Sequence, residues 1–196
     1  MTRKEEIVQM CMEIFSESGV QGLTMKAMAE RLQITEPAIY RHFENKQAVI
    51  VAMITQIRDE IFRFVDDVIQ RPLNAVEKLH KIFGYHLFYL REKKAIILEL
   101  LSEPFRQYPE VHRHITFLLQ DYHRRIRQVV VLGIKKREIP RNVQPEAVSI
   151  LFLGSLQHLL TIFKLEGNEE EIDLLSEEVF RHFCFILEGG GNYEMA

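Results

Sequence analysis

The scarcity of glycine and proline limits what this chain can fold into more than any other feature of its sequence. Only 9 of its 196 residues are Gly and only 6 are Pro, so long stretches contain neither. Because turns between strands rely on these two residues, their scarcity favours helices over a strand-and-turn protein. Apolar residues also recur at helical spacing, as in Ile7, Cys11, Ile14 and Phe15. The sequence therefore predicts an all-α protein.

The residues that begin and end helices divide the chain into about nine helices. Thr24, Thr35 and Asn45 are favoured at the N-cap, and Gly19 suits the left-handed residue that closes a helix. We expect a first helix that ends near residue 18, followed by helices over residues 25–32, 36–42, 45–70, 75–91, 95–103, 110–137, 145–165 and 169–188.

Composition and charge narrow the class of protein. Hydrophobic residues make up 47% of the chain and charged residues 27%, a globular balance that argues against disorder. We expect a soluble, cytoplasmic protein, because the N-terminus does not resemble a signal peptide and the most apolar segment, Ile150–Phe163, is too short to span a bilayer. Cys11 and Cys184 match no metal or disulfide pattern, which indicates a reducing compartment. The net charge of −3 means that any DNA binding must rest on local geometry.

One segment, residues 24–46 with the sequence TMKAMAERLQITEPAIYRHFENK, predicts a helix-turn-helix. It consists of two short capped helices joined by a tight turn and followed at once by a third helix. Such a pair presents the N-terminal end of its second helix outward, where it can enter a DNA major groove. Ile39 and Phe43, four residues apart, face the core and leave the polar residues around them to point outward.

This segment resembles the DNA-binding signature of the TetR family of bacterial transcription regulators. The resemblance lies in a Thr before an Ala-rich second helix and in a Tyr-x-x-Phe-x-x-Lys ending, here Tyr40, Phe43 and Lys46. It is tight over residues 7–53 and beyond them extends only to helix count and length. It implies phosphate contacts from Thr24, Lys26, Tyr40, His42 and Lys46. It also implies that five residues approach the bases: Thr35, Glu36, Pro37, Ala38 and Arg41.

Two residues depart from the family pattern. Gln33 stands at the turn position where members commonly have Gly, which predicts a strained or slightly different turn. Glu36 begins the recognition helix, where its charge repels phosphates. It either reads a base or only caps the helix, because an acid in the first turn favours the macrodipole.

Several contact residues have a second interpretation. Lys46 in the first turn of a helix opposes the macrodipole at a cost of roughly 0.3–1 kcal/mol, which a phosphate would offset and a solvated surface position would not. Tyr40 either contacts DNA or pads the small domain, and Arg41 and His42 either contact DNA or are solvated. The N-terminal Arg3 and Lys4 form either a phosphate-contacting arm or a frayed end.

The segment Ile150–Phe163 is apolar on nearly all sides and must be covered on both faces. One protomer covers one face, so we expect the last two helices of two chains to form a four-helix dimer interface, as the family resemblance also implies. The alternative is a fully buried monomer core. The predicted interface residues are Leu156, Leu160, Phe163, Val179, Phe180, Phe183 and Leu187.

The middle helices carry apolar and aromatic residues on faces that we expect to point inward. The family resemblance implies a ligand cavity among them, although the pattern does not separate a cavity lining from an ordinary packed core. The candidate ligand-binding residues are Phe62, Phe83, His86, Leu90, Leu101, Phe105, Phe117 and Tyr122.

The remaining chemistry predicts neither a cofactor nor a metal. His112 and His114 diverge on a helix and the other histidines lack ligand spacing, while no nucleophile–base pair, carboxylate pair or phosphate loop is present. We expect a non-enzymatic repressor with a DNA-binding domain (1–47), a ligand-binding and dimerisation domain (48–188) and a mobile tail (189–196). It would bind a palindromic operator as a homodimer and be released by an apolar or amphipathic molecule. The alternative is a DNA-bound factor whose body docks another protein and has no ligand.

Overall fold

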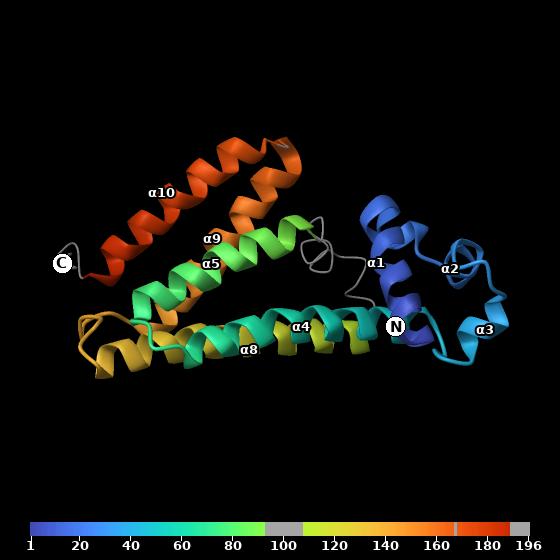
Figure 1. Cartoon of the computed structure of the whole chain (residues 1–196), viewed down its shortest axis with the longest axis horizontal. Helices are drawn as coiled ribbons and strands as arrows, with labels where there is room; N and C mark the ends of the chain where they lie inside the picture. Colours follow the sequence, from blue (N-terminus) through green and yellow to red (C-terminus); the bar gives the residue numbers. More distant parts are fainter. Residues whose placement is uncertain (93–107, 167, 189–196) are drawn as a thin grey trace. The chain divides into compact units, whose positions relative to one another are not determined.

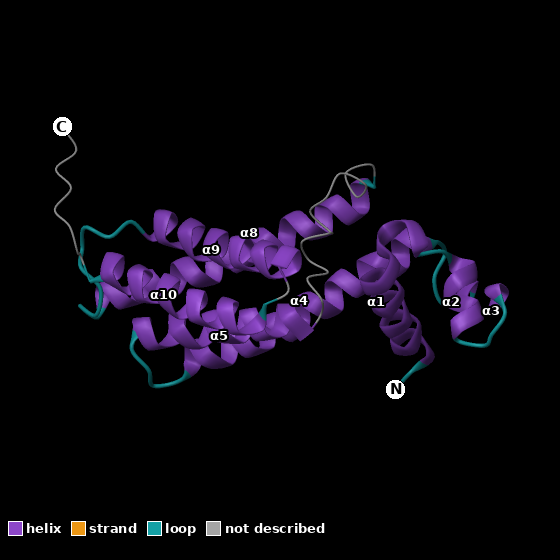
Figure 2. Cartoon of the chain, turned by 90° about the horizontal axis from the view of Figure 1, so that it is seen from above, coloured by secondary structure: helices purple, strands orange, loops and turns teal. Residues whose placement is uncertain are grey.

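The structure is a computed structural model that describes residues 1–92, 108–166 and 168–188. The described part of the chain contains helices and loops and no strand (Figure 2). The predicted all-α fold is confirmed, while the helix expected over residues 95–103 and the tail lie outside the described residues. The helices are α1 (Arg3–Gly22), α2 (Met25–Arg31), α3 (Glu36–Tyr40), α4 (Lys46–Gln70), α5 (Ala75–Glu92), α8 (Pro109–Lys135), α9 (Pro145–Glu166) and α10 (Glu169–Leu187) (Figure 1).

The ends of α1 follow from its local chemistry. Thr2 and Glu5 form a capping box, in which the Thr2 hydroxyl accepts from the Glu5 N–H and the Glu5 carboxylate accepts from the Thr2 N–H. The cap makes Arg3 the first residue of α1. Near the other end Gly19 takes φ 62° and ψ −164° and kinks the helix. The positive φ expected at Gly19 is confirmed, but the helix resumes after it and ends at Gly22.

Helix α3 is shorter than predicted. It ends at Tyr40 instead of His42, because the His42 N–H donates to the Ile39 carbonyl three residues back, at 2.8 Å, and tightens the last turn. Thr35 holds the N-cap position, but its side chain makes no capping hydrogen bond. The capping role predicted for that side chain is therefore wrong.

The chain divides into two compact units. Unit 1 comprises, of the described residues, 1–60, 92 and 108–118, and within it α1 packs on α2 and α2 packs on α3. The apolar faces of these helices and the first half of α4 form its core, so even the short α3 is anchored. The fully buried side chains of this core include Ile7, Cys11, Phe15, Met28, Ile39 and Val49.

Unit 2 comprises, of the described residues, 61–91, 119–166 and 168–188. Its core contains an aromatic cluster in which the Phe83 ring of α5 contacts Phe152 of α9 and Phe180 of α10, with ring centroids 5.5 and 5.3 Å apart. At the end of α8, Gly133 allows close packing against the start of α5. A Cβ added there would lie 2.5 Å from the Ala75 Cβ, so a larger residue would push the two helices apart.

Helix α9 is more extensive than its central apolar segment. The stretch Pro145–Leu165 is, by length and composition, long and apolar enough to cross a membrane, so the argument that it is too short is wrong for the whole helix. Core helices of soluble proteins share this property. Only 33% of its most apolar stretch of 18 residues is buried among the described residues of the protomer.

Candidate nucleic-acid interface

The turn between α2 and α3 is built around a residue with a positive φ. Gln33 has φ 54°, as expected for the position that commonly holds glycine. Its N–H donates to the Glu30 carbonyl at 3.1 Å and the Ile34 N–H donates to the Ala29 carbonyl at 3.0 Å. This hydrogen-bond pair closes α2 in a Schellman motif with Gln33 at the left-handed position.

Helix α3 exposes most of its surface and is anchored by two residues. Ile39 and Phe43 are buried, as predicted, and the Lys4 ammonium lies over the Phe43 ring, 5.7 Å from its centroid. Tyr40 is 49% exposed, too much for a residue that only pads the core. None of the ten predicted contact residues is buried. The six exposed ones are Thr24, Lys26, Thr35, Pro37, Tyr40 and Arg41. The four half-buried ones are Glu36, Ala38, His42 and Lys46.

The start of α2 is fixed by its predicted cap. The Thr24 hydroxyl accepts from the Ala27 N–H at 2.9 Å, so this side chain already has a structural role. Lys26 extends into solvent, and its nearest acidic partner is the exposed Glu30 at 3.8 Å. An exposed ion pair of this kind contributes about 0–1 kcal/mol and leaves the ammonium available to an anion.

Acidic residues are distributed unevenly over the helix starts. The first turns of α1, α3, α5, α8 and α9 each contain a glutamate, whereas those of α2 and α4 contain no acid. Glu36 is the glutamate of α3, where it stabilises the helix dipole. This placement supports the capping interpretation of Glu36, and base reading stays a prediction.

The start of α4 contains the feature that sequence reasoning missed. The Asn45 side chain caps the helix by accepting from the Ala48 N–H at 2.9 Å, as predicted. The Lys46 ammonium, however, donates to the backbone carbonyl of Val20 at 2.8 Å. Burial lowers the pKa of the half-buried Lys46. No sequence spacing marks this pair, because its acceptor is a backbone group 26 residues away.

The described ligand-binding candidates of unit 2 lie in its interior. Phe62, Phe83, His86 and Tyr122 are all buried. The Tyr122 hydroxyl and His86 Nδ1 form a hydrogen bond of 2.8 Å, and the Phe62 ring meets the Tyr122 ring edge-on at 5.8 Å. Burial lowers the pKa of His86 to about 3 and raises the pKa of Tyr122.

Of the other ligand-binding candidates, only the side chain of Phe117 is described. Phe117 is 53% exposed. The side chain of Leu90 and the whole of Leu101 and Phe105 lie outside the described residues. The ligand site therefore stays a prediction at all eight positions.

One ion pair beside this group was not predicted. The Arg125 guanidinium of α8 binds both carboxylate oxygens of Asp66 of α4, at 2.7 and 3.0 Å. It also lies over the Phe62 ring, 4.0 Å from its centroid. The pair fixes the packing of α4 on α8 beside Phe62 and Tyr122.

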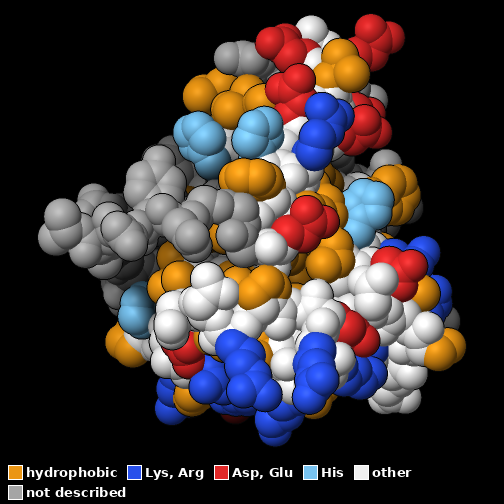
Figure 3. Space-filling model, turned by 90° about the vertical axis from the view of Figure 1, so that its left-hand side faces the viewer, with side chains coloured by type: hydrophobic (Ala, Val, Ile, Leu, Met, Phe, Trp, Pro, Cys, Tyr) orange, Lys and Arg blue, Asp and Glu red, His pale blue; other side chains and the backbone are white. Residues whose placement is uncertain are grey.

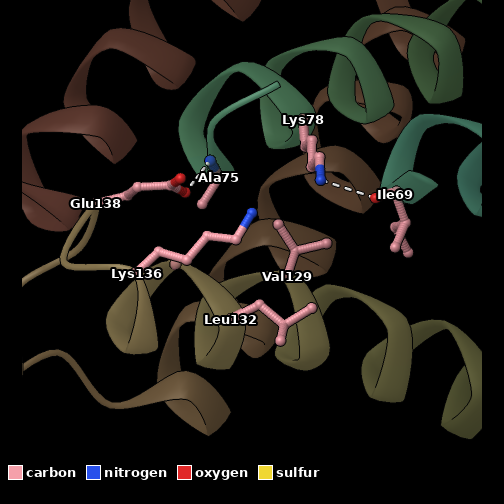
Figure 4. A pocket seen from close by; sticks show the side chains of 8 residues that line it. Ile69, Ala75, Lys78, Val129, Leu132, Lys136 and Glu138 are labelled. Atoms are coloured by element: carbon pink, nitrogen blue, oxygen red, sulfur yellow. Dashed lines mark hydrogen bonds between the residues drawn. The ribbon is translucent and has the colours of Figure 1, made fainter. Parts of the chain in front are cut away.

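A small pocket in unit 2 lies at a junction of helix ends (Figure 4). There Lys78 donates to the Ile69 carbonyl at 2.7 Å, and the Glu138 carboxylate accepts from the Ala75 N–H at 2.8 Å. Both charged groups thus satisfy backbone atoms at the end of α4 and the start of α5. None of the predicted ligand-binding residues lines this pocket.

The predicted dimer residues divide by burial. Leu156, Leu160, Phe180, Phe183 and Leu187 are buried inside the protomer, while Phe163 and Val179 are half-buried. The Phe180 ring contacts Phe83 of α5, and the Phe183 ring contacts Phe152 of α9. The five buried residues therefore lack the open face expected of them. Figure 3, which views the molecule from the side of the C-terminus, shows hydrophobic side chains at the surface between the charged ones. The exposed apolar residues of α9 and α10 are Ile150, Leu151, Leu165, Leu174, Phe185 and Ile186.

Two further kinds of site, a metal site and a reactive cysteine, depend on the remaining titratable residues. Within residues 1–92, 108–166 and 168–188 no three His, Cys, Asp or Glu side chains lie close enough together to hold an ion. Burial raises the pKa of the Cys11 thiol to about 12, so this cysteine stays a protonated, unreactive part of the core.

Two family descriptions match the chain: "Bacterial regulatory proteins, tetR family" over residues 7–53 and "YsiA-like protein, C-terminal region" over residues 53–186. The HTH-type transcriptional regulator UidR of Escherichia coli K12 is 26% identical over 197 residues, covering 95% of this chain and 91% of that protein. Tetracycline repressor protein class C of E. coli is 37% identical over 51 residues, 26% of this chain and 23% of that one. The structure of FadR from Bacillus subtilis superposes with a TM-score of 0.78 at 18% identity, covering 97% of this chain and 100% of that chain.

Proposed function

Because the chain belongs to the tetR family of bacterial regulatory proteins and is a helix-turn-helix transcription regulator, we propose that it is a cytoplasmic repressor. It binds a palindromic operator as a homodimer, and a small apolar or amphipathic effector releases it. The DNA-binding region is residues 1–47 and the effector and dimer region is residues 48–188.

The exposed surface of α3 carries this proposal. Ile39 and Phe43 hold the helix from one side, while Tyr40 and Arg41 remain in solvent beside Pro37. A short helix held in this way can enter a major groove, where Arg pairs with guanine edges and phosphate contacts fix the register. Lys26 on α2 extends the same surface with a cation.

The dimer is supported by apolar surface that the protomer leaves open. Ile150 and Leu165 on α9, and Leu174 and Phe185 on α10, are all at least half exposed. A second copy would cover these side chains and place two helix-turn-helix units on one operator. The seven predicted interface residues lie mainly below this surface and support the exposed residues that would contact the second copy.

The effector is proposed to act in unit 2, beside the His86–Tyr122 pair. That pair provides hydrogen-bonding groups beside the buried Phe62 ring, which suits a ligand with one polar group. The FadR structure from B. subtilis is a complex with stearoyl-CoA, an amphipathic molecule, and it shares this fold. Helix α4 passes through both units and would transmit the effector's presence to the DNA-binding region.

Selection of bound sequences from random DNA tests the operator. We expect enrichment of a palindrome bound by two chains, with affinity falling steeply as salt rises. Arg41→Ala should weaken this binding, whereas Arg124→Ala, an exposed arginine paired with Asp121 in unit 2, should not. Failure to enrich any sequence would contradict the proposal.

Native mass spectrometry of the purified dimer tests the effector. A retained small molecule that lowers operator affinity when added back supports an effector-responsive repressor. A protein partner captured through Ile150, Leu174 and Phe185 in place of a second copy would support the other function, a DNA-bound factor that docks a protein. The exposed apolar side chains favour that candidate only if the chain is a monomer in solution.

A further inference from the structure

The ammonium of Lys46 links two points that enclose the whole helix-turn-helix. It leaves the first residue of α4 and donates to the Val20 carbonyl in the last turn of α1, at 2.8 Å. Helices α2 and α3 lie between these two residues in the sequence. The link therefore closes the segment 20–46 at its base.

The Val20 carbonyl needs a partner from outside its own helix. The last carbonyls of a helix have no intrahelical donor, and they carry the negative end of the helix dipole. The last turn of α1 contains no basic residue, and Gly19 kinks the chain just before Val20. Lys46 supplies both the missing donor and the missing positive charge.

The same contact resolves the unfavourable position of Lys46 in its own helix. A cation in the first turn of α4 opposes the dipole of α4, but it lies at the favourable end of α1. The ammonium is half-buried, and a buried charge needs a hydrogen-bonding partner. A phosphate is therefore not required to explain a lysine at this position.

We infer that Lys46 is a positioning residue, which fixes the end of α1 to the start of α4 and so holds α2 and α3 in the orientation that binds DNA. Closing a segment of this length restricts its conformations, as any loop closure does. Its effect on operator affinity rests on the proposed DNA-binding function. The link itself can be tested without DNA.

Amide hydrogen exchange on the full-length chain tests the link. Lys46→Met keeps an unbranched side chain of similar length and removes the donor. We expect amides from Leu23 to Met28 to exchange roughly tenfold faster, since a hydrogen bond from a charged group contributes on that order. Lys46→Arg keeps a cationic donor and should restore part of the protection. Lys81→Met, which changes an exposed lysine of α5 in unit 2, should leave the exchange of these amides unchanged.

Equal exchange in Lys46→Met and the unchanged chain would overturn the inference, whatever the DNA affinity. If Lys46→Met does not fold, Lys46→Gln replaces it. Its amide donates a neutral hydrogen bond, and an intermediate increase in exchange is expected.

Operator titrations at several salt concentrations separate positioning from direct phosphate contact. A positioning role predicts that Lys46→Met weakens binding while the slope of log affinity against log salt stays the same, and that Lys46→Arg recovers affinity. A slope reduced by about one per protomer with unchanged exchange shows a phosphate contact alone and overturns the inference. Faster exchange together with a reduced slope supports positioning by a lysine that also contacts phosphate. If the protein without any substitution binds no operator, the proposed function is wrong. The exchange measurement then still tests the Lys46–Val20 link by itself.

Discussion

The candidate residues of unit 1 lie at the surface, whereas those of unit 2 lie in the interior. None of the ten DNA-contact candidates is buried, while Phe62, Phe83, His86 and Tyr122 are all buried. A substitution in unit 1 can therefore change binding without disturbing the core. A substitution in unit 2 changes the packing of the core, and any change in ligand response follows from that change in packing. Mutations at these sites should therefore alter DNA binding in unit 1 and stability in unit 2.

The largest effect is expected inside unit 2, from Phe183→Ala. Phe183 is 5% exposed and its ring meets Phe152 at 5.5 Å. Truncating a buried phenylalanine removes apolar burial and leaves a cavity, which costs about 3–5 kcal/mol of unfolding free energy. Denaturant titration at a fixed chain concentration measures it.

The matched control is Phe185→Ala, two residues further along the same helix. Phe185 is 58% exposed, so its loss should leave the protomer core intact and weaken association of the two chains instead. Sedimentation over a range of concentrations reports this. A Phe185→Ala protein that loses as much stability as Phe183→Ala, at concentrations where both are monomers, would contradict the assignment of inner and outer faces to α10.

A second interior effect concerns pH. Burial holds the pKa of His86 at about 3 in the folded state, against a usual value of about 6.5 in the unfolded chain. Between those values the unfolded state binds a proton that the folded state does not, so stability falls as pH falls. The contribution is at most about 1.4 kcal/mol per pH unit. Denaturation between pH 7.5 and 5 should show a shallower pH dependence for His86→Gln.

Tyr122→Phe serves as the control for that experiment. It removes the hydroxyl that bonds His86 Nδ1 and should lower stability at every pH, because the ring nitrogen loses its partner. The histidine stays buried, so the pH dependence should persist. If His86→Gln and the unchanged chain respond identically to pH, the histidine is open to solvent.

These two regions also differ in how much of them could be predicted from sequence. In unit 1 the Thr24 and Asn45 caps and the positive φ of Gln33 depend on residues within a few positions, and the structure confirms each. The Lys46–Val20 bond escaped prediction because its acceptor is a backbone carbonyl. Backbone acceptors leave no mark in the sequence.

In unit 2 the helices themselves were predicted closely, since their apolar spacing is local. The inward face of α9 was not predicted, because a helix that is apolar on nearly all sides has no polar face to show which side is covered. Leu156 and Ile150 look alike in sequence, yet the first is buried and the second is 62% exposed. Only the packing of the neighbouring helices on α9 decides between them.

In unit 1 the largest binding effect is expected from Arg41→Ala. Arg41 is exposed beside α3 and is proposed to approach a base, where a paired arginine contributes about 1–3 kcal/mol of discrimination. We expect weaker operator binding and a relaxed preference at one position of each half-site, with unchanged thermal stability. Repeating the selection from random DNA measures the preference. Retention of full affinity and sequence preference would show that Arg41 is merely solvated.

Glu36→Ala should have a smaller effect that separates its two interpretations. An acid in the first turn of α3 stabilises the helix by about 0.3–1 kcal/mol through the dipole. If capping is its only role, the variant loses that stability and selects the same operator. A changed operator sequence with unchanged stability would instead establish Glu36 as a base reader. Thermal melts and sequence selection on the same preparation distinguish them.

The smallest expected effect compares two turns of the same construction, one in each unit. Gln33 after α2 and Arg137 after α8 have φ of 54° and 63°, and both occupy the left-handed position of a Schellman motif. A residue with a Cβ is strained there by about 1 kcal/mol, which glycine relieves, while the greater freedom of glycine in the unfolded chain offsets part of the gain. Gln33→Gly and Arg137→Gly should therefore each be neutral or raise stability by a few tenths of a kcal/mol, measured by denaturation. Because the strain is local, the two values should agree although their surroundings differ. A loss above about 1 kcal/mol for Gln33→Gly alone would show that its side chain makes contacts the backbone argument omits.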